Sequence, residues 1–235
     1  MTPYFTKELL EAVNDWQVGS VGKKKKAKAI GKALKNSSVE RHLLECEAPC
    51  YRRSVLQPAA VKDLFFDFCV EEETSSWTTR LSVASTFKGG PPDPPVPGVI
   101  FEHTPTPSEV VLNLEQLYEH PQFWPSVRHW EDQGSNLSGG IRRYAGLQHE
   151  VILTVEEVPH EEIHAFGSNA AFELEKGVSE DVLLIGDSPL SAEELTKAFA
   201  EAELPLKRWV YGDSVPRIYS NWIRRVLKRF DVKLP

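Results

Sequence analysis

Segment 146–154 narrows the choice of fold, because it joins a glycine-rich loop, residues 133–146, to a strand with polar residues at its start. Side chains alternate between the two faces of a strand. The core-facing set is predicted to be His149, Val151, Leu153 and Val155. The opposite set is predicted to be Gln148, Glu150, Ile152 and Thr154. Gln148 and Glu150 would then lie about 7 Å apart at the start of the strand. They could be a pair of catalytic side chains next to the loop, or two solvated side chains on a strand edge.

Length and composition fit a globular protein with one large domain or one domain with appendages. The chain has 235 residues, of which 41% are hydrophobic and 26% charged. No apolar run approaches the roughly 18 residues of a membrane span, and residues 2–16 lack the pattern of a signal peptide. Three cysteines are an odd number for a disulfide framework. These features together predict a cytoplasmic protein.

The net charge of −7 is distributed unevenly along the chain. Seven lysines fall within residues 23–35, and without them the remainder carries −14. Such an acidic remainder argues against a general nucleic-acid binder. The lysine-rich segment, Lys23 to Lys35, could bind an anionic surface, or it could be the solvated face of a helix.

Hydrophobic periodicity predicts an α+β chain with helices at both ends. Helices are predicted over residues 3–16, 23–34, 39–46, part of 59–68, 81–87, 117–130, 191–203 and 216–230. Strands are predicted over residues 50–56, 76–79, 99–103, 109–114, 146–154 and 163–166, the last of these being the last strand of the sheet. Residues 88–98, rich in proline and glycine, are predicted to be a loop. The predicted organisation is an N-terminal helical segment (1–48), a core (49–167) and a C-terminal helical extension packed on the core (168–235).

Three short motifs follow one another along the predicted core. The first is an arginine after a tyrosine, Tyr51-Arg52; the second is Ser76-Trp77-Thr78; the third is Gln148-His149-Glu150. An arginine in a strand is costly to bury unpaired, so it either holds an anion in a cleft or lies in water on an edge strand. The ordered set resembles the mono-ADP-ribosyltransferase superfamily of bacterial toxins and phage enzymes, whose signature is Arg, then Ser-x-Ser/Thr, then Gln/Glu-x-Glu. The resemblance covers residues 50–166, about half of the chain.

The resemblance implies a split β-sandwich core that takes NAD as its substrate. A protein of this kind would transfer ADP-ribose to a macromolecular acceptor, protein or nucleic acid, and release nicotinamide. Glu150 would stabilise the cationic transition state at the ribose, and Gln148 would position the acceptor. The place of action would be the cytoplasm, including that of a host cell.

The resemblance also implies which residues would bind NAD. Arg52 would hold the diphosphate through charge-assisted hydrogen bonds, with Arg53 as second choice. Ser76 would orient Glu150 or the ribose, Thr78 would support the strand, and Phe87 would either stack on a ring of NAD or belong to the core.

Three other interpretations remain at the level of sequence. The same fold could be an NAD glycohydrolase, with water as the acceptor. The chain could instead be a non-enzymatic interaction protein that uses its basic N- and C-terminal helices. A zinc protease is suggested by His160-Glu161-Glu162-Ile163-His164, but a strand over residues 163–166 fits better than the helix that such a site needs. Cys46 and Cys50 have no second pair at ligand spacing, so no metal site is predicted.

Overall fold

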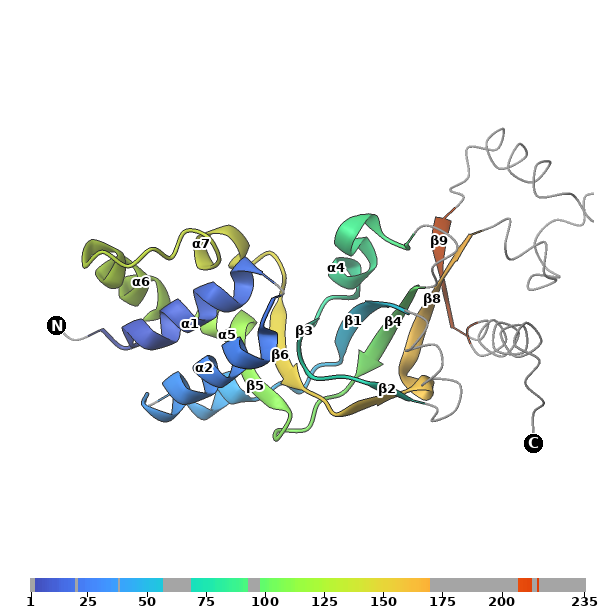
Figure 1. The fold of residues 1–235 in the computed structure, drawn as a ribbon, viewed down its shortest axis with the longest axis horizontal. Coiled ribbons are helices and arrows are strands. Elements are labelled where there is room, and N and C mark those ends of the chain that lie inside the picture. Colours follow the sequence, from blue (N-terminus) through green and yellow to red (C-terminus); the bar gives the residue numbers. More distant parts are fainter. Residues whose placement is uncertain are drawn as a thin grey trace, which may run out of the picture. The chain divides into compact units, whose positions relative to one another are not determined.

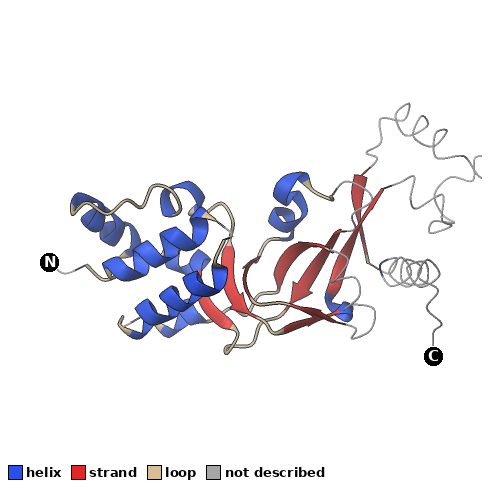
Figure 2. Ribbon diagram, viewed as in Figure 1, coloured by secondary structure: helices blue, strands red, loops and turns tan. Residues whose placement is uncertain are grey.

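The computed structural model describes residues 3–19, 21–37, 39–56, 69–92, 98–169, 207–212 and 215. The chain divides into two compact units (Figures 1 and 2). Unit 1 comprises Met1–Arg52, Glu71–Val83 and His103–Val158, and unit 2 comprises Arg53–Val70, Ala84–Glu102 and Pro159–Pro235. Helices and antiparallel strands together confirm the predicted mixed α and β class.

The elements alternate along the described chain. The helices are α1 (Lys7–Val18), α2 (Lys23–Lys35), η1 (Arg41–Leu44), α4 (Leu81–Thr86), η2 (Phe87–Gly89), α5 (Leu114–Glu119), α6 (Phe123–Asp132), α7 (Ile141–Tyr144) and η3 (His160–Glu162). The strands are β1 (Cys50–Val55), β2 (Cys69–Glu71), β3 (Thr74–Thr78), β4 (Gly98–His103), β5 (Val110–Asn113), β6 (Glu150–Thr154), β7 (Glu157–Pro159), β8 (Ile163–Asn169) and β9 (Lys207–Tyr211). Strands β2 and β7 form a small sheet of their own.

In unit 1 the strands lie in the order β5-β6-β3-β1. Strand β3 pairs with β6 along its whole length, from Thr74 opposite Thr154 to Thr78 opposite Glu150. Strand β1 joins β3 at the register of Tyr51 opposite Thr78. The chain therefore enters β6 beside the end of β3, and the two polar motifs of these strands share one end of the sheet.

Helices α1 and α2 lie side by side in unit 1 (Figure 1), and each packs into its core through one apolar face. Thr6 caps α1 by accepting a hydrogen bond from the N–H of Leu9. The apolar residues recur at helical spacing, and their side chains join those of β5, β6 and α5–α7 in one core. Its largest buried members include Phe5, Leu9, Leu10, Trp16, Ile30, Leu43 and Phe123. The two helices predicted near the N-terminus are thus confirmed.

Unit 2 contains β4, β8 and β9, paired in that order and antiparallel. Trp209 on β9 lies over two glycines and donates its indole N–H to the carbonyl of Ser85 at 2.8 Å. A Cβ at Gly167 would come within 3.0 Å of the Trp209 ring, and one at Gly98 within 2.5 Å of Pro92. Gly167 thus gives the indole room to pack against the sheet, and Gly98 gives room to Pro92.

Several predicted elements differ from those observed. The helix predicted over 39–46 is only η1, four residues long. The prediction that the strand over 163–166 is the last in the sheet was wrong, because β9 pairs with β8 from Asn169 to Ala165. Pro121 separates α5 from α6, whereas Pro125 lies in the first turn of α6, where a missing N–H costs nothing. The predicted elements over 59–68, 191–203 and 216–230 lie outside the described residues.

Strand β6 begins later than predicted, at Glu150. His149 has φ 45°, a left-handed conformation that interrupts the extended chain. The expected alternation of buried and exposed faces is absent as well. Val151, Ile152 and Leu153 are all fully buried, because both faces of β6 are covered.

Candidate functional site

The three motifs lie on three neighbouring strands of unit 1, namely β1, β3 and β6. Thr78 is directly opposite Glu150, and Ser76 is opposite Ile152. Arg52 donates from Nη1 to the carbonyl oxygen of Ser76 at 3.0 Å. The folded chain therefore brings Arg52, Ser76 and Glu150 together, although about a hundred residues separate the first from the last.

The Glu150 side chain is buried, with 4% of its surface exposed. Its Oε1 accepts from the indole Nε1 of Trp16 at 2.8 Å, and its Oε2 accepts from Nε2 of Gln17 at 3.3 Å. Both donors lie at the C-terminal end of α1. The possibility of a solvated carboxylate on a strand edge is thereby excluded, and the two N–H donors offset the cost of burying the charge.

Lys23, the first residue of α2, reaches the same end of the sheet. Its Nζ lies 2.9 Å from Oγ of Ser76 and 4.7 Å from the centre of the Trp16 ring. Burial lowers the pKa of Lys23 from its ordinary value of 10.5, and the negative charges of Glu150 and Glu72 partly oppose this effect. The hydroxyl predicted to orient Glu150 or a ribose thus has an ammonium group as its neighbour.

The Arg52 guanidinium forms a two-pronged ion pair with Glu72. Its Nε lies 2.9 Å from Oε2 of Glu72, and its Nη2 lies 3.1 Å from Oε1. Arg53 belongs to unit 2, where it donates from Nε to the carbonyl of Gly90 at 2.8 Å, and burial lowers its pKa. Of the two candidate arginines, Arg52 is therefore the one bonded to the Ser76 strand.

Gln148 and Thr78 meet through the backbone. Thr78 donates from Oγ1 to the carbonyl of Gln148 at 2.7 Å and accepts from the N–H of Arg80 at 3.2 Å. The backbone of His149 is in the left-handed conformation, so Gln148 lies outside β6 and is not on the same strand face as Glu150. The prediction that Gln148 and Glu150 lie side by side on one face was wrong. His149 is held by Glu115, whose Oε1 lies 2.7 Å from Nδ1 of the ring.

Phe87 lies in unit 2, on η2, and 47% of its surface is exposed. It is therefore not a core residue, which was one of its two predicted roles. On α4, which precedes η2, only Ala84 is buried.

No local sequence pattern selects Trp16, Gln17, Lys23 or Glu72 for the site. Gln17 Oε1 and the hydroxyl of Tyr118 are also buried there, and no hydrogen bond of good geometry reaches either atom within the described part of the chain. Burial and the charge of Glu150 raise the pKa of Tyr118 well above its ordinary value, and the nearby Gln17 side chain opposes this effect. The lysine run at 23–35 and the acidic run at 71–73 stand out in the sequence. Neither pattern indicates that Lys23 from the first run and Glu72 from the second lie at this site.

No metal centre is found among the described residues, where no group of three or more His, Cys, Asp or Glu could hold an ion. The predicted strand at Ile163 is confirmed, since His160 lies on η3 and His164 on β8. The two histidines pair with different carboxylates, those of Glu161 and Glu102. One helix presenting both to zinc is thus excluded.

Comparison of the chain with protein-family models gives no match, and neither do searches of curated proteins and of solved structures. None of the helices in the described ranges combines the length and the apolar character that a bilayer crossing needs.

Proposed function

We propose that the protein transfers ADP-ribose from NAD to a macromolecular acceptor and releases nicotinamide. The observation that carries the proposal is the convergence of Arg52, Ser76 and Glu150 on adjacent strands of one sheet. A guanidinium, a hydroxyl and a carboxylate are the groups that this chemistry uses, for the diphosphate, the ribose and the developing cation. The finer fold assignment, an ADP-ribosyltransferase-like split β-sandwich, belongs to the same proposal.

Glu150 supplies the catalytic charge in this scheme. When the bond between nicotinamide and ribose breaks, positive charge develops on the ribose, and a fixed carboxylate nearby lowers the energy of that state more than the energy of bound NAD. A buried carboxylate acts strongly, because the surrounding dielectric constant is low. NAD must then displace part of α1, and Gln17 is the weaker of the two bonds to break, at 3.3 Å against 2.8 Å for Trp16.

Two cations are available for the diphosphate. Arg52 can form paired hydrogen bonds with phosphate oxygens, as it does with Glu72. Lys23 lies beside Ser76 and adds a second positive charge. Phosphate binding would compete with Glu72 for Arg52, so Glu72 acts as a stand-in anion that keeps the guanidinium in place before NAD arrives.

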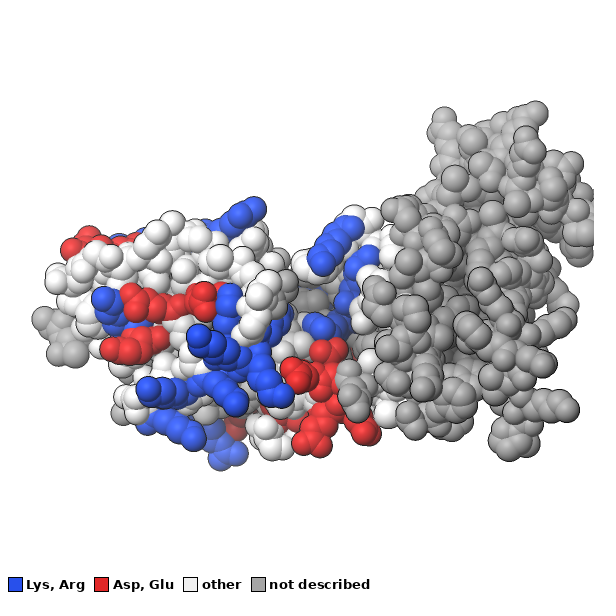
Figure 3. Space-filling model, viewed as in Figure 1, with Lys and Arg blue, Asp and Glu red and all other residues white. Residues whose placement is uncertain are grey.

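The exposed face of α2 favours an anionic acceptor. Its exposed lysines are Lys24, Lys25, Lys28, Lys32 and Lys35, and Figure 3 shows Lys and Arg side chains gathered over this part of unit 1. Such a surface attracts nucleic acid or an acidic protein patch. Gln148, half-buried next to Thr78, is the residue placed to orient the acceptor group.

Incubation of the purified protein with NAD labelled in the adenosine half tests the proposal. Label on protein or nucleic acid supports transfer, free ADP-ribose alone supports the glycohydrolase, and no consumption of NAD with any acceptor refutes both. The matched pair Arg52→Ala and Arg53→Ala serves as control, since only the first changes the site. Steeply salt-dependent binding to an anionic polymer without NAD consumption would favour the interaction protein.

A further inference from the structure

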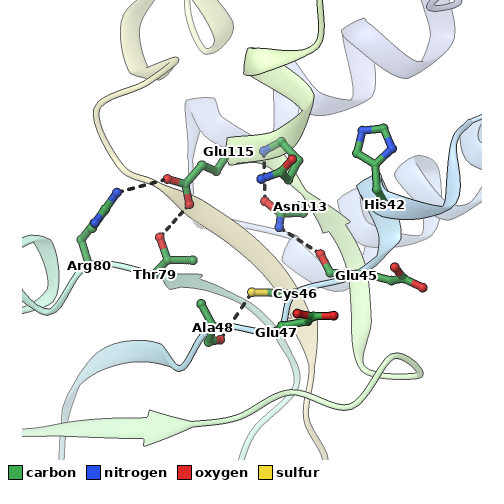
Figure 4. A pocket seen from close by; sticks show the side chains of 10 residues that line it. His42, Glu45, Cys46, Glu47, Ala48, Thr79, Arg80, Asn113 and Glu115 are labelled. Atoms are coloured by element: carbon green, nitrogen blue, oxygen red, sulfur yellow. Dashed lines mark hydrogen bonds and ion pairs between the residues drawn. The ribbon is translucent and has the colours of Figure 1, made fainter.

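Unit 1 contains a cavity of about 470 Å³ lined by both polar and apolar surface (Figure 4). The residues that line it include Glu45, Cys46, Glu47, Thr79, Arg80 and Glu115. Thr79, Arg80 and Glu115 form one connected group, with Thr79 Oγ1 2.7 Å from Glu115 and Arg80 Nη2 3.9 Å from it. The remaining wall is the irregular segment that leads from η1 to β1 and contains Cys46.

Two cysteines meet at this wall. The Sγ atoms of Cys46 and Cys50 lie 3.7 Å apart, and both point towards the carbonyl oxygen of Ala48, at 3.5 Å and 3.7 Å. Cys46 is half-buried and lines the cavity, whereas Cys50, the first residue of β1, is buried. One thiol is therefore open to small molecules and the other is sheltered directly behind it.

The two thiols differ in acidity because they share one hydrogen bond. The bond from Cys50 lowers the pKa of Cys46 to about 7, against the opposing effect of burial. The same bond, together with burial, raises the pKa of Cys50 far above its ordinary value. At neutral pH Cys46 thus carries a substantial thiolate fraction, which is the nucleophilic form of cysteine.

We propose that Cys46 and Cys50 form a dithiol site that reacts with a small hydroperoxide and closes to an intramolecular disulfide. The Cys46 thiolate attacks one peroxide oxygen, the O–O bond breaks, and with one proton the products are water (an alcohol from an organic peroxide) and a sulfenic acid on Cys46. The Cys50 sulfur then attacks the Cys46 sulfur, the S–O bond breaks, and the proton of Cys50 leaves with the hydroxide as water. Cysteine is oxidised by two electrons and the peroxide is reduced by two.

The geometry favours a small neutral oxidant. Glu45, Glu47 and Glu115 line the same cavity, and the negative charge of Glu115 opposes thiolate formation at Cys46. An anionic oxidant such as glutathione disulfide would be repelled by these carboxylates, whereas hydrogen peroxide would not. The sulfurs must approach from 3.7 Å to about 2.05 Å, a movement that the irregular segment before β1 can supply.

Treatment of the purified full-length protein with hydrogen peroxide tests the site. We expect a mass loss of about 2 Da, corresponding to two hydrogen atoms, in a peptide that joins Cys46 to Cys50. In Cys50→Ser a dimedone-type reagent should trap the sulfenic acid on Cys46, and Cys46→Ser should give neither product. Cys69→Ser is the matched control and should behave as the parent protein.

Alkylation with iodoacetamide across pH provides a second readout that does not depend on oxidation. Reaction at Cys46 should reach half its maximal rate near pH 7, and Cys50→Ala should move this midpoint upwards because the donated hydrogen bond is lost. No mass loss, a disulfide that includes Cys69, stoichiometric zinc on the two thiols, or an unmoved midpoint would each overturn the proposal. These outcomes are independent of whether NAD is consumed.

Discussion

Replacement of Glu150 by glutamine removes one charge and keeps nearly the same shape. Trp16 can still donate to the amide oxygen at its present distance of 2.8 Å. The new NH2 group would face Nε2 of Gln17, which is also a donor. A half-turn of the Gln17 amide brings its oxygen into position to accept, and its NH2 group then faces the Tyr118 hydroxyl, whose oxygen can accept from it. We therefore expect the substitution to cost less than about 1 kcal/mol in unfolding free energy.

Glu150→Ala is the contrasting variant. It removes both acceptors, so the buried indole N–H of Trp16 loses its partner, at a cost of about 1–3 kcal/mol. The order of stability in urea titration should be wild type, then Glu150→Gln close behind, then Glu150→Ala clearly lower. Equal losses in the two variants would show that the Gln17 amide does not turn.

The reaction rate of Glu150→Gln should fall far more than its stability does. Loss of a charge that stabilises the transition state costs about 2.7–4 kcal/mol, or a factor of about 10² to 10³ in rate. Nicotinamide release by Glu150→Gln, measured under single-turnover conditions, should fall by at least a hundredfold while the melting temperature stays near that of the wild type. Turnover within a few-fold of wild type would remove Glu150 from the mechanism, whatever the fate of the fold.

Three other substitutions address separate parts of the site. Arg52→Ala should weaken NAD binding in calorimetry more than Arg53→Ala does, because Arg52 is bonded to the Ser76 strand, and the reverse order would reassign the anion holder. Burial lowers the folded-state pKa of Lys23 below its ordinary value of 10.5. Between these two pKa values the unfolded chain binds more protons than the folded chain, so the free energy of unfolding rises with pH. In urea titrations Lys23→Met should lose this rise and Lys24→Met should keep it, and identical profiles for the two variants would contradict the reasoning. His149→Gly should be more stable than His149→Ala by about 1 kcal/mol, since only glycine removes the left-handed strain, and an alanine variant of equal stability would argue against strain.

The helical part of the fold was accessible to sequence reasoning because local spacing determines it. The apolar residues of α1 and α2 recur at 3.6-residue intervals, and these residues form the observed core. Strand β6 was harder to predict, because side chains on both of its faces are buried and the alternation of apolar and polar residues is lost. The polar residue Glu150 therefore looked like a surface residue, although it is as buried as its apolar neighbours.

The candidate site was predictable only in part, because some of its residues lie far from one another in the sequence. The motifs on β1, β3 and β6 could be linked through their resemblance to a known order of motifs. The contacts that enclose Glu150 come from Trp16 and Gln17, which lie 134 and 133 residues away in the sequence. No local pattern in α1 distinguishes a tryptophan that fills a core from one that also donates to a carboxylate, since both occupy the same helical face.

The charges at the end of the sheet decide how a dinucleotide could bind there. Lys23 senses three charged neighbours at this end of the sheet. Besides the lowering effect of burial, Glu150 and Glu72 raise the pKa of Lys23 and Arg52 lowers it. Two cations and two anions thus neutralise one another without any ligand, and this pairing offsets the free-energy cost of burying the four charged side chains. A diphosphate adds two further negative charges, so it can bind only if Arg52 exchanges Glu72 for phosphate and Glu72 turns towards solvent. In the proposed reaction Glu150 loses only the weaker bond from Gln17 and keeps the bond from Trp16, so it is the carboxylate held in place while charge develops on the ribose.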